Sequence, residues 1–257
     1  MIVDVNVHLG RWPFRRVKGD EPAELTAKLK AHGVQSAWIG SFDALLHRDI
    51  AAVNARLAEE CQRHGKDLLV PFGTVNPALP FWEDDLERCR QRHHMPGIRL
   101  YPAWHGYRLD HPAFAALLTA AAAQGLIVQL ALRLEDERTL HPLLRLHPIN
   151  LTPLVELVAS LPRLRLVLLN HSGAVNADVL KKLTRAGQVY VDIATVEGLG
   201  GVTQLLQTVP ADRVLFGSHF PFFYYESAVL KLRESKLETA QERVIRYDNA
   251  KRLFSPS

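Results

Sequence analysis

Residues 164–171 read LRLVLLNH, a run of apolar residues that ends on two polar ones. Short, continuous apolar runs of this kind are typical of strands in a parallel sheet that is covered on both faces. Seven similar runs occur elsewhere in the chain: Ile2–His8, Gln35–Gly40, Leu68–Val75, Gly97–Pro102, Ile127–Leu132, Val189–Ala194 and Arg213–Gly217. The starts of the eight predicted strands are separated by 33, 33, 29, 30, 37, 25 and 24 residues, which is the length of a strand–helix repeat.

Amphipathic segments with apolar residues three and four positions apart fill the intervals, as expected for helices. They are Pro22–His32, Ile50–His64, Trp82–His93, Pro112–Gln124, Thr152–Leu161, Ala177–Ala186 and Val202–Val209, and residues 224–254 add an eighth helix and an amphipathic tail. Glycine follows four of them, at Gly33, Gly65, Gly125 and Gly187, where we expect the left-handed conformation that ends a helix.

Eight strand–helix units in about 250 residues predict a closed (β/α)8 barrel of the α/β class, a TIM barrel. No linker rich in proline, glycine or serine divides the chain, so we expect one domain over residues 1–257. An open doubly wound sheet is the alternative. The barrel is favoured because no Gly-x-Gly-x-x-Gly turn follows the first predicted strand.

The composition is that of a globular protein, with 47% hydrophobic and 23% charged residues, and it excludes wholesale disorder. The net charge is +4, but the 31 basic residues are spread among 27 acidic ones, so no nucleic-acid partner is expected. The chain shows neither a signal-peptide pattern at Met1 nor an apolar stretch of about 20 residues, which predicts a cytoplasmic protein without a membrane partner. Two cysteines, Cys61 and Cys89, are expected to be reduced and packed.

Polar residues gather at the predicted ends of the strands, where barrels of this kind carry their active sites. In chain order they are Asn6, His8, Asp43, Asn76, Arg99, Tyr101, Gln129, Arg133, Glu135, His171, Asp192 and His219. Because side chains alternate along a strand, Asn6 and His8 share one side. Three histidines from strands one, six and eight, His8, His171 and His219, are therefore predicted to converge on a metal site or an acid–base site.

Structural roles are the alternative for each of these residues. A single histidine at the end of a strand is often only hydrogen-bonded in place. Arg99 is expected either to bind a substrate anion or to be an internal cation paired with Asp4 or Glu135. Trp104, in the fourth loop, either covers a pocket or packs on the barrel rim.

Five segments, taken in order, resemble the amidohydrolase-related (metal-dependent hydrolase) family of TIM barrels, which also contains decarboxylases. They are IVDVNVHLG (2–10), GIRLYPAWHGYRLDHPAF (97–114), LRLVLLNHSG (164–173), RVLFGSHFPF (213–222) and DNAKRLF (248–254). The resemblance therefore runs through nearly the whole chain.

The metal motif of that family is altered here. Its usual His-x-His at strand one reads Asn6-Val7-His8, its strand-five histidine falls on Ala131, and its strand-eight acid is replaced by His219. The resemblance implies one divalent metal, zinc, held by His8, His171 and His219, with an open position for water. Glu135 would then be the base for that water. In the alternative the site is free of metal, and His171 and His219 transfer protons or only bind a ligand.

The fifth loop continues the inward side of strand five at Arg133, beside the space that Ala131 leaves. Arg133 and Arg99 are expected to anchor a substrate carboxylate, with Asn6 and Tyr101 as further substrate-binding residues. The alternative for residues 133–138 is a solvated run of charges that opens the next helix.

The resemblance implies hydrolysis of a small organic, carboxylate-bearing substrate, an amide, ester or lactone. Non-oxidative decarboxylation is the alternative within the family, and a ligand-binding barrel that has lost catalysis is the alternative outside enzymes. Small molecules are the expected partners, and the sequence leaves a homo-oligomer open.

Overall fold

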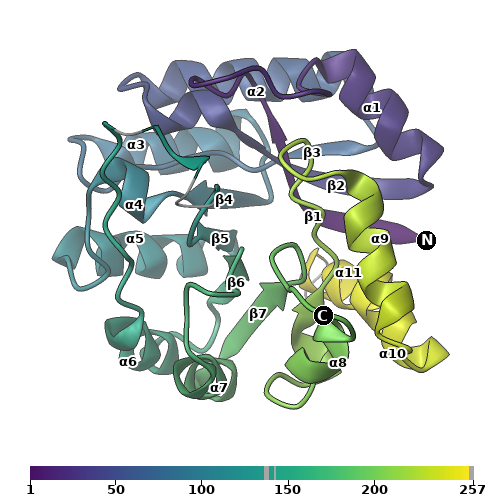
Figure 1. Ribbon diagram of the computed structural model, residues 1–257. Coiled ribbons are helices and arrows are strands. Elements are labelled where there is room, and N and C mark those ends of the chain that lie inside the picture. Colours follow the sequence, from purple (N-terminus) through teal and green to yellow (C-terminus); the bar gives the residue numbers. More distant parts are fainter. Residues whose placement is uncertain (136–138, 142, 255–257) are drawn as a thin grey trace.

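The structure is a computed structural model that describes residues 1–135, 139–141 and 143–254. It confirms all eight predicted strands and the (β/α)8 barrel. The strands are β1 (Ile2–Leu9), β2 (Val34–Ser41), β3 (Leu69–Pro71), β4 (Gly97–Leu100), β5 (Ile127–Ala131), β6 (Arg165–Leu169), β7 (Gln188–Asp192) and β8 (Val214–Leu215). Neighbouring strands pair in parallel as β1-β2-β3 and as β4-β5-β6-β7-β8, and helices surround them (Figure 1).

Two seams join these groups of strands into a barrel. At the first, Gly73 bridges to Ile98, and Arg99 N donates to Gly73 O at 2.7 Å. At the second, Val7 bridges to Phe220, while His219 N donates to the backbone oxygen of Asn6 at 2.8 Å. The second seam matters for function because it sets the segment after β8 against the end of β1.

The helices follow the predicted segments closely. They are α1 (Pro22–Ala31), α2 (Ile50–Gly65), α3 (Trp82–Glu87), α5 (Pro112–Ala123), α6 (Thr152–Ser160), α7 (Ala177–Ala186), α8 (Gly201–Leu205) and α9 (Tyr225–Glu234). Side-chain caps begin two of them, since Asp49 accepts from Ala52 N before α2 and Asn176 accepts from Val179 N before α7.

Several details differ from the sequence prediction. Helical turns at Phe42–Leu45 and α4 (Pro102–His105) follow β2 and β4, and the tail forms α10 (Thr239–Arg243) and α11 (Asn249–Phe254). Gly33 and Gly125 adopt the predicted left-handed conformation, with φ of 69° and 68°. The prediction was wrong for Gly65, which is the last residue of α2, and for Gly187, which is extended.

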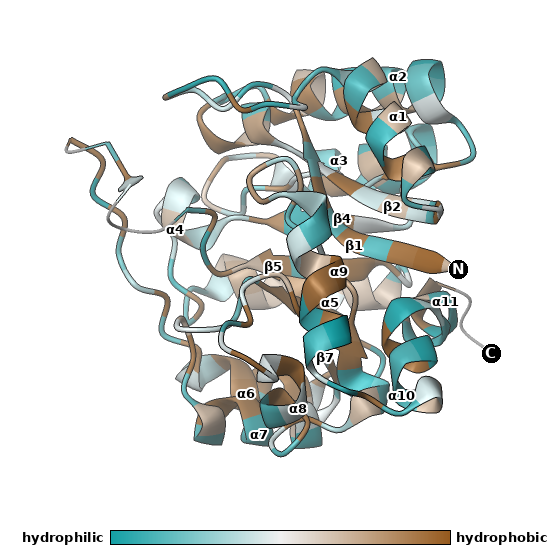
Figure 2. Ribbon diagram, turned by 45° about the vertical axis from the view of Figure 1, so that its right-hand side comes forward, coloured by the Kyte–Doolittle hydropathy of each residue, from teal (hydrophilic) through white to brown (hydrophobic). Residues whose placement is uncertain are grey.

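The largest apolar cluster joins the strands to the helices around them, and a smaller one lies at the strand ends that face the functional loops. Figure 2 shows this layering, with hydrophobic strands inside helices whose outer faces are hydrophilic. Cys61 and Cys89 are buried free thiols, as predicted. In the described part of the chain, no helix is long and apolar enough to cross a membrane. One domain over residues 1–257 stays a prediction.

Candidate active site

A network of buried amides and carboxylates lies at the C-terminal ends of β1, β6 and β7. Asn6 Nδ2 donates to Asp192 Oδ2 at 2.7 Å and to Asn170 Oδ1 at 2.9 Å. Asn170 N donates to Asp192 Oδ1 at 2.9 Å, and Asn170 Nδ2 donates to the backbone oxygen of Arg133 at 2.7 Å. Both N–H groups of the Asn6 side chain therefore donate to other side chains of the protein. Its Oδ1 has no hydrogen-bond partner among the described residues.

Sequence reasoning missed Asn170. It has a φ of +57°, a left-handed conformation that asparagine tolerates better than most residues. The Asn-His pair at the end of the sixth strand was the available signal.

Two carboxyl groups in this network are fully buried and hold protons tightly. Burial raises the pKa of Asp192 to about 6, against hydrogen bonds from Asn6 and Asn170 that lower it. Burial likewise raises the pKa of Asp4 to about 7, although Asp4 Oδ1 accepts from Ser218 N and Asn6 N. Asp4 Oδ2 is buried without a partner among the described residues.

His171 stands at the edge of this network, where the loop after β6 begins. It is 4% exposed, and burial lowers its pKa to about 4, while a hydrogen bond with the backbone of Asp192 opposes the shift. Its Nδ1 is buried and has no partner in the described structure. Next to it, Arg133 donates from Nη2 to the backbone oxygen of Ser172. His171 is thus a neutral imidazole at pH 7, with one ring nitrogen uncommitted.

His219 adopts a left-handed backbone conformation, with φ of +58°, in the segment after β8. Its Nε2 lies 2.6 Å from the backbone oxygen of Leu134, so this nitrogen carries the proton and donates. Burial lowers the pKa of His219 to about 4. The ring of Phe222 stacks on it at 5.2 Å.

His8 lies beside His219, as the sequence predicted, with ring centroids 5.4 Å apart in an edge-on arrangement. Its ring stacks on Phe42 at 4.6 Å with an interplanar angle of 3°. His8 Nε2 is 3.1 Å from Arg99 Nη1, and Nδ1 is buried without a partner among the described residues.

Arg99 is fully buried inside the barrel, and all of its donors are taken by the protein. The acceptors are Gln129 Oε1 (2.8 Å), the backbone oxygens of Val7 (2.8 Å), Trp38 (2.9 Å) and Val5 (3.2 Å), and His8 Nε2 (3.1 Å). An arginine has five N–H groups. The expectation that Arg99 binds a substrate carboxylate is therefore corrected, because no donor remains. Arg99 is internal, as the alternative prediction had it, but neither Asp4 nor Glu135 is among its hydrogen-bond partners.

The other predicted residues lie around this centre. Tyr101 is fully buried, and burial raises its pKa to about 12. Glu135 forms an ion pair with Arg15, so its carboxylate is already engaged. Arg133 is half-buried. Residues 136–138 of the predicted charge run lie outside the described residues.

An aromatic roof, defined here as Trp12, Phe42, Trp104 and Phe222, covers the barrel mouth. The Trp12 ring lies 4.7 Å from Phe222, 5.3 Å from Trp104 and 5.4 Å from Phe42. Trp104 thus covers the site, one of its two predicted alternatives. Sequence reasoning missed the other three rings, because their loops are distant in sequence and only the seams bring them together.

Buried polar atoms without partners are concentrated on this side of the barrel. Among the described residues they are Asp4 Oδ2, Asn6 Oδ1, His8 Nδ1, Trp12 Nε1, Asp20 Oδ2, Thr74 Oγ1, Tyr101 Oη, Trp104 Nε1, His105 Nδ1, Tyr107 Oη, His171 Nδ1 and Tyr225 Oη. All of these residues except Tyr225, which begins α9 and stacks on His32 at the end of α1, belong to β1 or to a loop or helical turn that follows a strand. Since buried polar groups are normally paired, this is the side on which a polar ligand or water is expected.

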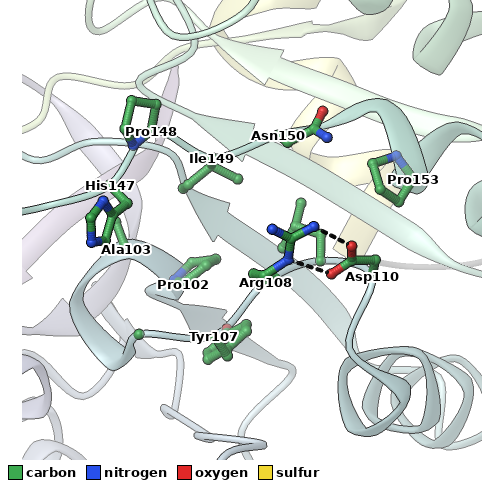
Figure 3. Close-up of a pocket in the computed structure, with 12 residues that line it drawn as sticks. Pro102, Ala103, Tyr107, Arg108, Asp110, His147, Pro148, Ile149, Asn150 and Pro153 are labelled. Carbon is green, nitrogen blue, oxygen red and sulfur yellow. Dashed lines mark hydrogen bonds and ion pairs between the residues drawn. The ribbon is translucent and has the colours of Figure 1, made fainter.

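Two cavities flank the roof. One, of about 520 Å³, lies between the loop after β4 and residues 147–153 (Figure 3). Its charge is neutralised locally, because Arg108 and Asp110 form two hydrogen bonds across it. Proline and aliphatic side chains make up half of its lining residues.

The second cavity, of about 450 Å³, lies between residues 15–19, the first turns of α1 and residues 220–224. Its lining includes four cationic side chains and one acid: Arg15, Arg16, Lys18, Lys28 and Glu24. Three of these cations form ion pairs with acids outside the lining, Arg15 with Glu135, Arg16 with Asp20 and Lys28 with Glu226. Phe222 belongs both to its wall and to the roof over His219. We call it the basic cavity.

A sequence model of the amidohydrolase family matches residues 3–255. The chain belongs to the amidohydrolase family. No curated protein matches it.

Solved structures give the same fold. An uncharacterised TIM-barrel protein from Bordetella bronchiseptica has a TM-score of 0.74 at 15% identity, covering 98% of this chain and 97% of that one. The 2,6-dihydroxybenzoate decarboxylase from Rhizobium has a TM-score of 0.72 at 15% identity, covering 98% of this chain and 98% of that one. A dihydroxybenzoic acid decarboxylase from Polaromonas, solved with bound manganese and an inhibitor, has a TM-score of 0.70 at 14% identity. The match covers 98% of this chain and 96% of that one. At these identities the similarity concerns the fold.

A divalent metal, implied by the amidohydrolase family, does not fit the residues present in this chain. The described residues contain no group of three or more His, Cys, Asp or Glu side chains that could hold a metal ion. His8 Nε2 faces the Arg99 cation, His219 Nε2 is committed to Leu134 O, and Ala131 offers no ligand atom. The expectation that His8, His171 and His219 together hold zinc is therefore corrected.

Proposed function

We propose that this amidohydrolase-family chain is an enzyme that hydrolyses a small carboxylate-bearing molecule at the barrel mouth, with acid–base chemistry supplied by side chains and without a metal. The observation that carries the proposal is His171. It is neutral at pH 7, nearly buried, and its Nδ1 is uncommitted.

His171 would act as the general base. Its Nδ1 accepts a proton as the oxygen of a water molecule bonds to the substrate carbonyl carbon. The same nitrogen then returns the proton to the leaving oxygen or nitrogen as that bond breaks. Water is consumed, and the imidazole ends as it began.

The substrate anion would be held by Arg133. Its guanidinium lies within 3.1–3.2 Å of the position that a side chain on Gly173 would occupy, which places it beside the segment that carries His171. An arginine can bind a carboxylate through two parallel hydrogen bonds.

The protonation states favour hydrolysis over decarboxylation. Hydrolysis needs a base, and burial keeps His171 and His219 neutral at pH 7. Decarboxylation needs an acid to protonate the carbon that loses CO₂. Asp4, whose pKa burial raises to about 7, is the carboxyl most able to hold a proton near neutral pH, and it is fully buried in the network.

Non-oxidative decarboxylation is the second candidate. The structures from Rhizobium and Polaromonas that share the fold are named as decarboxylases of dihydroxybenzoates. A mouth closed by an aromatic roof and a site without exposed histidines also suit a reaction that needs no water.

The test is a screen of chelator-treated protein against small carboxylate-bearing esters, lactones and amides, and against aromatic acids. Mass spectrometry follows the products, and evolved CO₂ is measured in parallel. Hydrolysis that is lost in His171→Asn supports the proposal, with His64→Asn as a matched control because His64 is ion-paired with Glu60 on α2. Release of CO₂ would replace it with the second candidate. No turnover in the whole panel would favour the ligand-binding barrel. Cytoplasmic location and a homo-oligomer stay predictions.

A further inference from the structure

Arg99 and His8 form a contact that decides where the proton on His8 sits. The guanidinium has only donors and cannot accept a hydrogen bond. At 3.1 Å from Arg99 Nη1, His8 Nε2 must therefore be the acceptor, and it carries no proton. Burial, then the charges of Arg99 and His219, hold the pKa of His8 well below its ordinary value. The ring is neutral, and its single proton sits on Nδ1.

The Nδ1–H group of His8 is a donor without an acceptor. It is buried and has no hydrogen-bond partner among the described residues. The ring cannot easily turn to find one, because it lies flat on Phe42 at 4.6 Å and edge-on to His219 at 5.4 Å. A buried donor of this kind costs free energy unless a ligand or water accepts its proton.

Arg99 itself is fixed. Its remaining four N–H groups bind Gln129 and the backbone oxygens of Val5, Val7 and Trp38. Gly40 supplies the space, since a Cβ there would lie 2.7 Å from Arg99 Cδ, Arg99 Nη1 and Tyr101 Oη. The guanidinium is therefore a permanent positive charge on the Nε2 side of the His8 ring.

We propose that Arg99 is a positioning residue that takes the electrostatic place of the family's metal, and that it holds His8 as an Nδ1–H donor aimed at an oxygen anion of the substrate. This rests on the proposed function only for the identity of the acceptor. His8 transfers no proton in this role. It donates a hydrogen bond to the oxygen that gains negative charge when the carbonyl is attacked, or to a carboxylate oxygen.

The test is NMR on protein labelled with ¹⁵N in its histidines, which distinguishes a protonated ring nitrogen from an unprotonated one. The signals of His8 are assigned by their loss in His8→Asn. At about pH 7.5 the expected result is a neutral His8 ring with protonated Nδ1 and bare Nε2, unchanged when about five equivalents of zinc are added. A proton on Nε2, a charged ring, or a His8 signal that zinc displaces would overturn the proposal.

Arg99→Lys tests the cause of this protonation state. A lysine ammonium offers three donors in place of a planar fork of five, so His8 should show a mixture of the two neutral forms. Arg165→Lys is the matched control, because Arg165 is also a buried arginine and donates to the backbone oxygens of Gly125 and Leu253 without contacting a histidine. An unchanged His8 in folded Arg99→Lys would overturn the role of Arg99. If that variant does not fold, the measurement on the unaltered protein still tests whether His8 carries its proton on Nδ1.

This outcome is independent of the proposed function. The NMR measurement needs no substrate, and His171→Asn should abolish hydrolysis while the signals of His8 stay in place. A chain without any activity could therefore still show the expected His8 ring.

Discussion

The two ends of the barrel each hold a buried arginine, and the two are used differently. At the N-terminal end, Arg165 at the start of β6 donates to the backbone oxygens of Gly125 and Leu253, which attaches α11 to the barrel. At the mouth, Arg99 spends one of its donors on the ring of His8. Arg165 therefore joins segments of backbone, whereas Arg99 also orients the ring of His8, whose Nδ1 has no partner in the described structure.

The same contrast holds for the surrounding polar atoms. Apart from Tyr225 Oη on α9, every buried side-chain atom without a partner in the described structure lies on β1 or on a loop or helical turn that follows a strand. None lies on the segments that lead into the other strands, around Arg165. Buried polar atoms are normally paired, and unpaired ones lower the stability of the fold. We therefore infer that these atoms mark the side of the barrel that binds a ligand.

The first prediction compares the two arginines directly. Arg99→Met removes five hydrogen bonds, of which only the one to Val5 O is backed by a second donor, Gln129 Nε2. At roughly 1 kcal/mol for each of the other four, the loss in free energy of unfolding is about 4 kcal/mol or more. Arg165→Met removes two such bonds from a residue nearer the surface and should cost about 2 kcal/mol. Urea unfolding of both variants measures the difference. Equal costs would mean that Arg99 is no more than a second structural cation.

The second prediction concerns the base at the mouth. His171→Asn should lower kcat on an identified substrate by about 10²–10⁴-fold, the usual contribution of a general base. The free energy of unfolding should fall by no more than about 1 kcal/mol, because the substitution removes one hydrogen bond, with the backbone of Asp192, and His171 Nδ1 has no partner to lose in the described structure. Retained activity in a folded His171→Asn would remove His171 from the mechanism, whereas His64→Asn should behave like the unaltered protein.

The third prediction uses the raised pKa of Asp4. A carboxyl whose pKa is 3.8 unfolded and about 7 folded binds more protons in the folded state, so its contribution to stability is lost as pH rises from about 4 to 7. Asp4→Asn keeps an oxygen to accept from Ser218 N and Asn6 N, and it cannot ionise. As the pH rises from about 5 to 8, the free energy of unfolding of the variant should therefore increase by on the order of 2 kcal/mol relative to that of the unaltered protein.

Both proteins in that comparison share the buried histidines, whose lowered pKa values add stability as pH rises from about 4 to 6.5. That effect cancels in the difference. Urea unfolding curves over the pH range give the result, and a difference that does not change with pH would mean that Asp4 titrates normally.

The fourth prediction tests the space that Arg99 needs. Gly40→Ala places a Cβ 2.7 Å from Arg99 and Tyr101, neither of which has room to move, and should cost about 1–2 kcal/mol of unfolding free energy. In the control Gly201→Ala, the nearest atom is a methyl group of Val196 at 2.9 Å. Thermal unfolding of both variants is the measurement, and a Gly40→Ala protein as stable as the control would mean that Arg99 is not held tightly.

The smallest expected effect is at Glu135. Its carboxylate pairs with Arg15, whose side chain is 48% exposed, so Glu135→Gln should cost no more than about 1 kcal/mol of stability. It should lower activity far less than His171→Asn, by under about tenfold. A loss as large as that of His171→Asn would restore Glu135 as the base that the sequence suggested.

The sequence was a good guide to which residues reach the mouth. Runs of apolar residues predicted each strand, and alternation along β1 placed His8 and Asn6 on one side.

The state of those residues could not be read from the sequence. Arg99 donates to His8 Nε2, and the two residues are 91 positions apart. Arg15 takes the carboxylate of Glu135 from 120 positions away. Residue type and strand position predict proximity, whereas the partner of each nitrogen and oxygen depends on side-chain geometry across the barrel.

The most direct test of the account is the metal content of protein purified without a chelator or a nickel column. It predicts less than about a tenth of an equivalent of zinc or manganese per chain, unchanged after both metals are offered back. About one equivalent of either metal, lost in His8→Ala or His219→Ala, would contradict it, because these nitrogens would then bind a metal ion in place of Arg99 and Leu134.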